Sequence, residues 1–373
     1  MKTLLFWALT VASAAAQTIG IDTHIDTPQR VLIEGVDLAS RLKDGHVDIP
    51  RLKQGGMNAP FFALWVPTFY HGAEAVRRTL DLRDAMQRVF DQHPDLIELA
   101  VSASDVERIT KTGKIAAILS LEGGHQIDND LAVLRMYQRL GIRAMTLTHF
   151  RNTDWADSST DKPAHNGLAD FGKKVVQEMN RIGMIVDVSH VSDKTFYDAV
   201  AASSKPVIAT HSSCRALNDM PRNMTDDMLR ALAKNGGVVS INFYPSFVSP
   251  KDAQAGKKLI SSQVALEPDL KGAALDDFAR QNHFKELRSM KPAQATIDDI
   301  VANIDHAVKV AGIDHVGIGS DFDGIDSVPN GLEDISKMPQ LAAALRKKGY
   351  SDADIQKIWS GNVLRVMRVV IGR

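Results

Sequence analysis

The amino-acid sequence predicts an α/β fold of the (β/α)8, TIM-type barrel class, formed by a single domain. Eight short apolar runs are separated by polar segments, and six of the eight end in a residue that can bind a metal or move a proton. Apolar runs of this length suit strands buried on both faces, as parallel sheets require. Reactive residues at the carboxyl ends of such strands suit a barrel, because its active site lies at that face. The runs are residues 19–26, 59–66, 115–122, 144–149, 184–190, 206–211, 237–243 and 315–321.

The segments between these runs carry the period of amphipathic helices. In residues 74–92, apolar side chains fall toward one face and charged side chains fall opposite. Further helices are expected at residues 129–140, 168–181, 193–202, 225–235, 297–311 and 351–370. In the last of these, Ser351 is the expected N-cap, and Asp354 completes an arrangement like a capping box. Alternating strands and helices are what a parallel α/β architecture requires.

Residues 244–292 interrupt this alternation. The segment is polar, rich in lysine, and contains Pro245, Pro250, Pro268 and Pro292. In a barrel it would be a loop insertion between strands seven and eight, on the active-site face and with helical pieces. A surface insertion and a lid over the substrate are both compatible with this composition.

The N-terminus has the pattern of a secretory signal peptide. Lys2 supplies positive charge, residues 4–12 are apolar, and three alanines precede Gln17. The alternative is an uncleaved membrane anchor, for which the apolar stretch is short. We therefore expect a signal peptide at residues 1–16, a barrel domain at residues 17–373, and an exported protein, periplasmic or secreted. After cleavage, no stable membrane anchor is expected.

Composition restricts the classes of partner. The formal net charge is −1, with 44% hydrophobic and 24% charged residues, which is ordinary for a soluble globular protein. This balance gives no electrostatic reason to expect nucleic acid or an anionic membrane as partner. Cys214 is the single cysteine, so no intramolecular disulfide can form. A buried small residue is favoured over a nucleophile at this position, because no base is assigned to it.

Metal-binding residue types occur at the ends of the first and third runs. His24 and Asp26 lie two positions apart, and residues i and i+2 of a strand point to the same side. A second such pair, His46 and Asp48, follows a polar, turn-like segment and is interpreted as structural. Glu122 ends an apolar strand, where a carboxylate is costly unless it is paired or bound to a metal. Its two oxygens could bridge two cations, or it could form a salt bridge with a lysine or arginine.

Three successive runs end in His149, His190 and His211. A lone histidine at a strand end is usually structural, but this series together with His24 favours a metal site. Mixed ligation by histidine and carboxylate suits zinc or similar divalent ions. The last run ends in Asp321, which continues the strand directly, whereas Asp323 fits a turn in the loop. A carboxylate beside such a centre can move a proton.

These residues lie in a series of motifs that resembles the membrane (renal-type) dipeptidase family, zinc peptidases within the amidohydrolase-like barrels. The resemblance runs over most of the chain after residue 16. Its motifs are THID at 23–26, VDIPRLKQGG at 47–56, SLEGG at 120–124, LTHFRNTDWADS at 147–158, DVSH at 187–190, THSSCRAL at 210–217, PRNMTD at 221–226, INFYP at 241–245, GIGSDFDG at 317–324 and GLEDISKMP at 331–339. Agreement in this long order is far more specific than any single motif.

The resemblance implies a role for each site residue. One zinc would be held by His24, Asp26 and Glu122, and a second by Glu122, His190 and His211, so that Glu122 bridges two zinc ions per subunit. His149 would contact the substrate and its oxyanion, and Asp321 would handle the proton. Arg222 would bind the substrate carboxylate, for which a planar bidentate donor is suited. Tyr244 is a further candidate for substrate contact. The chain departs from the family at Phe150, where LTHN is often seen, which would alter the pocket beside His149.

The function expected from this resemblance is that of a metallo-dipeptidase. A metal-bridging hydroxide would cleave dipeptides that have a free C-terminal carboxylate, with tolerance of a D-residue at the C-terminal position. The expected partner is thus a small dipeptide, and family members are often homodimers. One alternative is another amidohydrolase, such as a lactamase, although many of those begin with HxH. The other alternative is an exported metal- or peptide-binding protein without activity, which could dispense with Asp321 and His149.

Overall fold

A computed structural model describes residues 18–287 and 292–372, so the predicted signal peptide at 1–16 lies outside the described residues. The predicted fold class is confirmed as a mixed α/β chain built on a curled parallel sheet. Along the sheet the strand order is β1-β3-β4-β5-β6-β7-β8, and β2 pairs with β3 off this path. The strands are β1 (Phe61–Trp65), β2 (Ile97–Leu99), β3 (Ile115–Glu122), β4 (Ile142–Thr146), β5 (Ile185–Asp187), β6 (Ile208–Ser212), β7 (Val238–Ile241) and β8 (Val316–Ile318).

The first predicted strand, residues 19–26, does not form a regular strand. Instead it lies between β8 and β1 and makes single bridges to both. The Thr23 N–H donates to the carbonyl of Ile318 at 2.9 Å, and the Phe61 N–H donates to that of Asp22 at 2.7 Å. Because the segment alternates between two partners and enters a helix at Thr27, no continuous ladder develops. It still closes the ring, so the eighth position in the barrel is occupied.

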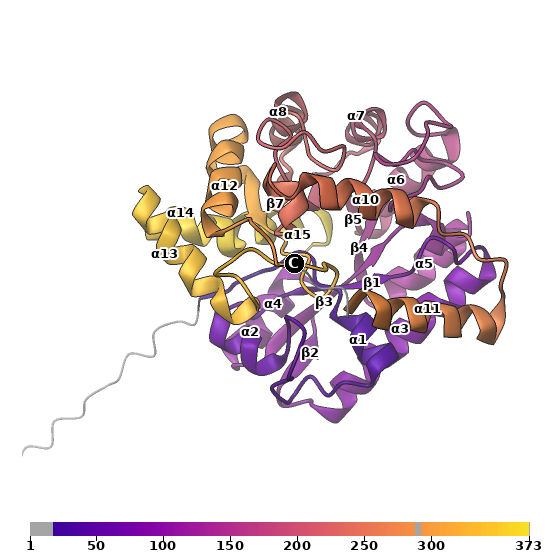
Figure 1. Ribbon diagram of the computed structural model, residues 1–373, viewed down its shortest axis with the longest axis horizontal. Helices are drawn as coiled ribbons and strands as arrows, with labels where there is room; N and C mark the ends of the chain where they lie inside the picture. Colours follow the sequence, from indigo (N-terminus) through magenta and orange to yellow (C-terminus); the bar gives the residue numbers. More distant parts are fainter. Residues whose placement is uncertain (1–17, 288–291, 373) are drawn as a thin grey trace, which may run out of the picture.

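Helices surround the strands (Figure 1). They are α1 (Thr27–Glu34), α2 (Ile49–Gly55), α3 (Ala73–Gln92), α4 (Ala103–Lys111), α5 (Leu131–Arg139), α6 (Asp170–Ile182), α7 (Asp193–Ala202), α8 (Asp226–Asn235), α9 (Pro245–Val248), α10 (Ala253–Val264), α11 (Gly272–Leu287), α12 (Ile297–Ala311), α13 (Met338–Lys348), α14 (Asp352–Gln356) and α15 (Asn362–Val370). The predicted final helix is divided into α14 and α15 by a π-helical turn at Lys357–Gly361, and its capping box at Ser351 and Asp354 is present. The apolar period predicted α3, α5 to α8 and α12, but not α1, α2, α4 or α13.

Every second residue of the ring strands faces the barrel interior. At the amino-terminal end of the strands this layer is apolar and is closed by α15; it includes Phe61, Ile118, Ile185, Ile208, Val238, Val363 and Met367. Burying each such side chain stabilises the fold by about 1.5–3 kcal/mol. The same strand faces become polar toward the carboxyl ends, where Ile118 is followed by Ser120 and then Glu122. A period of two thus directs the polar side chains into the opposite end of the barrel.

The insertion between β7 and β8 is helical, as expected for residues 244–292, and contains α9, α10 and α11. Helix α11 is fixed to the body by polar contacts. Asp276 accepts hydrogen bonds at 2.9 Å from both Arg77 and the Tyr70 hydroxyl, and His283 Nε2 lies 2.7 Å from Glu34 Oε1. In Figure 1, α10 and α11 border the centre of the ring. No helix in the described part of the chain combines the length and the apolar character that crossing a membrane requires.

Candidate functional site

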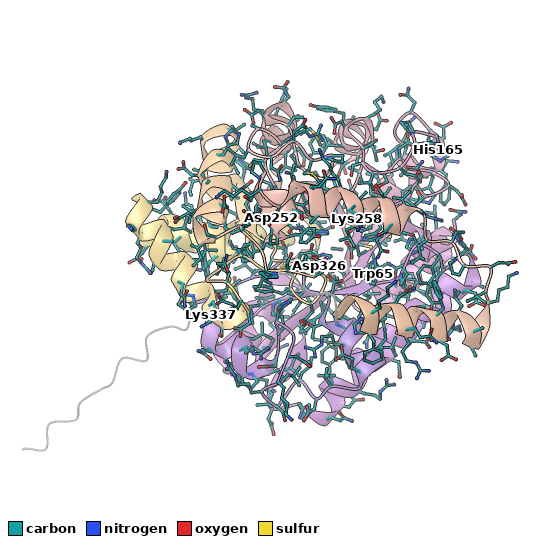
Figure 2. The ribbon with its side chains drawn as sticks, in the orientation of Figure 1. Trp65, His165, Asp252, Lys258, Asp326 and Lys337 are labelled. Carbon is teal, nitrogen blue, oxygen red and sulfur yellow. The ribbon has the colours of Figure 1, made fainter. Side chains whose placement is uncertain are left out.

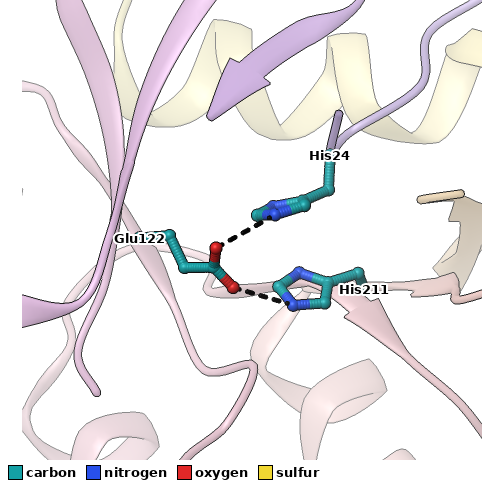
Figure 3. Close-up of side chains that lie close together, drawn as sticks. All are labelled: His24, Glu122 and His211. Atoms are coloured by element: carbon teal, nitrogen blue, oxygen red, sulfur yellow. Dashed lines mark ion pairs between the residues drawn. The ribbon is translucent and has the colours of Figure 1, made fainter. Parts of the chain in front are cut away.

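Glu122 lies at the centre of the polar end of the barrel, between histidines from two sides (Figure 3). Its Oε2 is 3.4 Å from His24 Nε2, while its Oε1 is 2.9 Å from His190 Nε2 and 3.3 Å from His211 Nε2. Gly123, with φ of +108°, lets the chain turn away directly after this carboxylate. Each carboxylate oxygen therefore faces a different set of imidazoles, which is the arrangement of a bridging ligand.

The remaining predicted ligands complete three overlapping groups, in each of which the ligand atoms lie within 4.8 Å of one another. The groups are His24, Glu122 and His211; Glu122, His149 and His190; and His24, Asp26 and Asp321. These groups divide the residues differently from the two ligand sets that the resemblance implies. His149 is as much a part of the cluster as the others, since its Nε2 is 3.7 Å from Glu122 Oε1.

The donor atoms of this cluster fit a divalent cation. The Nε2 atoms of His190 and His211 lie 2.8 Å apart, and both side chains are buried. In the described residues, His24 Nε2 and Asp26 Oδ1 are buried without any hydrogen bond. Buried polar atoms without a partner are unfavourable unless a ligand satisfies them. Imidazole nitrogens mixed with carboxylate oxygens suit zinc or a similar ion.

Burial sets the protonation of the cluster. It lowers the pKa of His149, His190 and His211 well below the usual value, and the Arg222 charge acts in the same direction. Burial raises the pKa of Glu122, and it raises the pKa of Asp26 to about 6. For His24, the charges of Glu122 and Asp26 overcome burial and raise the pKa well above its usual value. Without metal, the lowered pKa values favour the neutral form of the three histidines, whereas His24 holds its proton more tightly than a free imidazole does.

This distribution predicts that metal affinity rises with pH. A cation needs deprotonated ligands, so it must displace protons from groups whose pKa is raised, and displacement is hardest below that pKa. The three histidines whose pKa is lowered contribute less to this dependence, because they give up their protons more readily. We expect zinc affinity to increase from pH 5.5 to 8, with protons released on binding. Calorimetry at pH 6.5 in two buffers of different ionisation enthalpy measures this release, and an affinity independent of pH would contradict it.

A hydrogen-bond relay fixes the orientation of His211. The Thr210 hydroxyl lies 2.6 Å from Asp187 Oδ2 and 2.9 Å from His211 Nδ1. Because the carboxylate can only accept, the hydroxyl donates to Asp187 and accepts from His211 Nδ1–H. The neutral ring therefore carries its proton on Nδ1, and the Nε2 lone pair is left facing Glu122. Partners of this kind orient metal-binding histidines.

Replacing Thr210 with valine is expected to weaken metal binding by roughly 10–100-fold, the usual effect of losing such an outer partner. Valine keeps the shape of the side chain but cannot accept the hydrogen bond from His211 Nδ1–H. Thr146→Val is the matched control, because the Thr146 hydroxyl donates to the same Asp187 oxygen without touching His211. Zinc titration in competition with a chelator measures the change. Equal effects of the two variants would show that only the environment of Asp187 matters.

Asp321 lies in a strained backbone segment beside the cluster. His190, Asp321 and Asp323 each have φ of +66°, and they are three of the six non-glycine residues with positive φ in the described chain. Such conformations cost about 1–3 kcal/mol each and tend to occur where function requires them. The Asn242 side chain donates to Asp321 Oδ2 at 2.9 Å, and burial raises the pKa of Asp321 to about 7. A carboxyl group with a pKa in this range can exchange a proton near neutral pH.

A cavity of about 140 Å³, called the main cavity below, opens over the cluster. Glu122, His149, His190 and Asp321 form its floor. Its walls include Trp65 and Asp326, both labelled near the middle of Figure 2, together with Phe150, Tyr244, Phe247, Leu259 of α10 and His283 of α11. The Phe150 ring lies 4.3 Å from that of His149, so this departure from the family motif makes the wall apolar beside His149.

Arg222 is buried beside the main cavity. It donates to the carbonyl of His211 at 3.0 Å, and its guanidinium lies 5.3 Å from the centre of the Phe247 ring. Its Nε and Nη1 are buried and have no hydrogen-bond partner in the part of the chain that the structure describes. Burial lowers its pKa to about 10, so it remains a cation at neutral pH. Two donors are therefore left for an anionic ligand.

The structure brings all nine predicted site residues to one end of the barrel, and it adds several that sequence reasoning missed. The inward-facing positions recur with a period of two along each strand, and they include Asp187, Thr210 and Asn242. This alternation could have predicted that these three side chains point into the barrel. His46 was interpreted as structural, but it lines the main cavity, where its Nδ1 accepts from the Asp323 N–H at 2.9 Å. Its neighbour Asp48 does have a structural role, as the N-cap of α2. No local pattern indicated the position of His46.

Comparison with known proteins agrees with this geometry. Residues 11–371 match the family model described as membrane dipeptidase, peptidase family M19. Dipeptidase tcpJ of Claviceps purpurea is 37% identical over 337 residues, which span 87% of this chain and 69% of that protein.

Two solved structures are similar over nearly their whole length. The probable dipeptidase PvdM from Pseudomonas aeruginosa has a TM-score of 0.81 and 28% identity, covering 95% of this chain and 96% of that one. A metallo peptidase from Rhodobacter sphaeroides, liganded with a phosphinate mimic of the dipeptide L-Ala-D-Ala, has a TM-score of 0.77 and 25% identity. The latter match covers 95% of this chain and 99% of the other.

Proposed function

Since this chain belongs to the membrane dipeptidase family of metallopeptidases and is a dipeptidase, we propose that it acts with two zinc ions bridged by Glu122. We further propose that it hydrolyses dipeptides with a free C-terminal carboxylate and tolerates a D-residue at that end. The observation that supports the bridged pair is the position of the two Glu122 oxygens. One is 3.4 Å from His24, and the other is 2.9 Å from His190.

The bound metals would supply Lewis acidity and a water activated for attack at neutral pH. His24, Asp26, Glu122, His190 and His211 would hold them. The other residues act on the substrate and on its protons. Asp321, with a pKa raised to about 7, accepts a proton from the attacking water and returns it to the leaving amine.

Arg222 and His149 position the substrate in this proposal. The free donors Nε and Nη1 of Arg222 bind the C-terminal carboxylate, and a longer peptide would have no charge at that place. His149 lies on the cavity floor and donates to the carbonyl oxygen as it becomes negative. Tyr244 contributes to the wall on the same side as Phe247. Acceptance of a D-residue is supported by the ligand of the Rhodobacter sphaeroides structure, a mimic of L-Ala-D-Ala.

The proposal is tested by counting metal and measuring hydrolysis on the same preparation. Protein stripped with a chelator is reloaded with zinc, and the zinc bound per chain is measured. L-Ala-L-Ala, L-Ala-D-Ala and the C-terminal amide of L-Ala-L-Ala are then compared as substrates. We expect two zinc ions per chain, cleavage of both dipeptides, and little cleavage of the amide. Full activity with one zinc, or equal cleavage of the amide, would contradict it.

We also propose that the protein is exported, with residues 1–16 removed as a signal peptide, and that it forms a homodimer. The support for export is the order of Lys2, an apolar core and three alanines. N-terminal sequencing of protein recovered outside the cytoplasm would test it, with Gln17 as the expected first residue.

A further inference from the structure

A smaller cavity lies beside the main cavity and contains a buried cation that the mechanism does not use. This side cavity measures about 20 Å³, and its lining includes Arg78 of α3, Gln29 of α1 and Asn282 of α11. It shares Gln29, Trp65, Gln263 and His283 with the main cavity, so the two adjoin. In Figure 2, Trp65 is labelled next to α11, where the two cavities meet.

Arg78 carries a charge that is not paired with a carboxylate of the described residues. Its side chain is buried, with 6% of the residue exposed, and no carboxylate of residues 18–287 or 292–372 lies within 4.0 Å of its guanidinium. Within these residues its one hydrogen bond, from Nη2 to Gln29 Oε1, is long at 3.5 Å. The Tyr70 ring lies 5.8 Å away. Buried charges are normally paired, because removing a cation from water is costly unless an anion offsets that cost.

The buried polar atoms of this cavity that have no hydrogen-bond partner in the described residues are donors. Trp65 Nε1, Arg78 Nε and Asn282 Nδ2 are each buried without a hydrogen-bond partner in the described residues. Three residues that line one small cavity thus present three unused donors. A carboxylate is the complement of such a set, since it only accepts hydrogen bonds and carries the opposite charge. A cavity needs about 10–15 Å³ to hold one water, so the side cavity, at about 20 Å³, has room for a small polar group.

The side cavity lies across the ring from Arg222. Arg222 follows β6, whereas Trp65 ends β1, and three positions separate β1 from β6 in either direction around the ring. A substrate whose C-terminal carboxylate is bound at Arg222 would extend over the Glu122 cluster toward Trp65. The part of the dipeptide that reaches Trp65 and Arg78 is then its N-terminal residue.

We propose that Arg78, with Trp65 and Asn282, forms an anion subsite that selects dipeptides whose N-terminal residue has an acidic side chain. The inference rests on the proposed function, because the placement of the substrate depends on Arg222. Arg78 acts here as a binding residue: it neutralises the side-chain carboxylate and fixes the dipeptide across the cluster.

The first test uses the unaltered, zinc-loaded protein and pairs of nearly isosteric substrates. L-Glu-L-Ala is compared with L-Gln-L-Ala, and L-Asp-L-Ala with L-Asn-L-Ala. In at least one pair, kcat/KM for the acidic member is expected to be higher by about tenfold or more, because the neutral member leaves the donors unpaired. Equal values in both pairs would overturn the proposal. So would a preference seen only when the acidic residue is at the C-terminal position, as in L-Ala-L-Glu against L-Ala-L-Gln.

The second test uses Arg78→Met, which keeps the length of the side chain but removes its charge and donors. The ratio between the kcat/KM values of L-Glu-L-Ala and L-Gln-L-Ala is expected to fall to about one, mainly through a higher KM for L-Glu-L-Ala. Arg88→Met is the matched control, since Arg88 is on the same helix, is exposed and pairs with Asp84. It should leave the ratio unchanged. If Arg78→Met does not fold, the substrate pairs still decide the question on the unaltered protein.

The two proposals fail in different ways. If no dipeptide is cleaved, including L-Ala-L-Ala, the proposed function is wrong and the subsite loses its basis. If L-Ala-L-Ala is cleaved but neither L-Glu-L-Ala nor L-Asp-L-Ala is cleaved more efficiently than its neutral partner, the proposed function holds and the anion subsite does not exist.

Discussion

The Glu122→Gln variant is expected to lose both of the proposed zinc ions together with dipeptide hydrolysis. Each oxygen of Glu122 faces a different set of histidines, so an amide that offers one oxygen and one NH2 group cannot serve both. Losing an outer partner of a metal ligand already costs roughly 10–100-fold in affinity. Loss of the shared ligand itself should therefore lower zinc affinity at both proposed metal positions by more than this factor. The value of kcat/KM should fall with it. Metal content after dialysis and hydrolysis of L-Ala-L-Ala are the measurements.

Unfolding of the metal-free proteins separates this effect from misfolding. Burial raises the pKa of Glu122, so the ionised carboxylate is unfavourable in the empty site, and glutamine removes that charge at constant size. Metal-free Glu122→Gln should unfold at the same temperature as the metal-free wild type or higher. Glu98→Gln, at a glutamate that pairs with Arg108 on the surface, should keep both metals. A Glu122→Gln protein that retains one tightly bound zinc would show that Glu122 does not bridge.

The strand positions and the cluster were predictable because both depend on local periodicity. An apolar run with reactive residues at its end indicates a buried strand, and a period of two then places Ile118 and Glu122 on the same face. Parallel strands end at one face of a barrel, so residues far apart in the sequence, such as His24 and His211, were expected to meet. Their rings lie 3.8 Å apart in the structure.

Other features depend on pairings that no local pattern encodes. The contact of His46 with Asp323 joins residues 277 positions apart, and it gives a histidine from a polar turn a place on the cavity wall. Residues 19–26 have the composition of a strand, yet they divide their hydrogen bonds between β8 and β1. The side cavity depends on the packing of α11, part of the insertion between β7 and β8, against α1 and α3. In each case tertiary contacts override or complete the local preference.

Asp321→Asn is expected to lower kcat by about 10²- to 10⁴-fold, the range typical of general acid–base groups, while zinc content stays at the wild-type level. Asparagine can keep the hydrogen bond with Asn242 but cannot take up a proton. Deprotonation of Asp321 activates it as a base, so the wild-type rate should rise with pH through the pKa of that group, and the variant should lose this rise. Metal-free Asp321 has a pKa raised to about 7 by burial, and a nearby cation would move it lower.

Asp323→Asn is the sharpest comparison, because the two aspartates are two residues apart and share the same φ of +66°. The oxygens of Asp323 are already engaged: Oδ2 accepts from the Thr27 hydroxyl at 2.7 Å, and Oδ1 accepts from the His46 N–H at 2.6 Å. An amide there would break one of these contacts and lower the free energy of unfolding, yet the rise of kcat with pH should persist in the folded enzyme. The opposite result, in which Asp323→Asn removes the rise of kcat with pH and Asp321→Asn keeps it, would show that the proton passes through Asp323. The positive φ of Asp321 would then need another explanation.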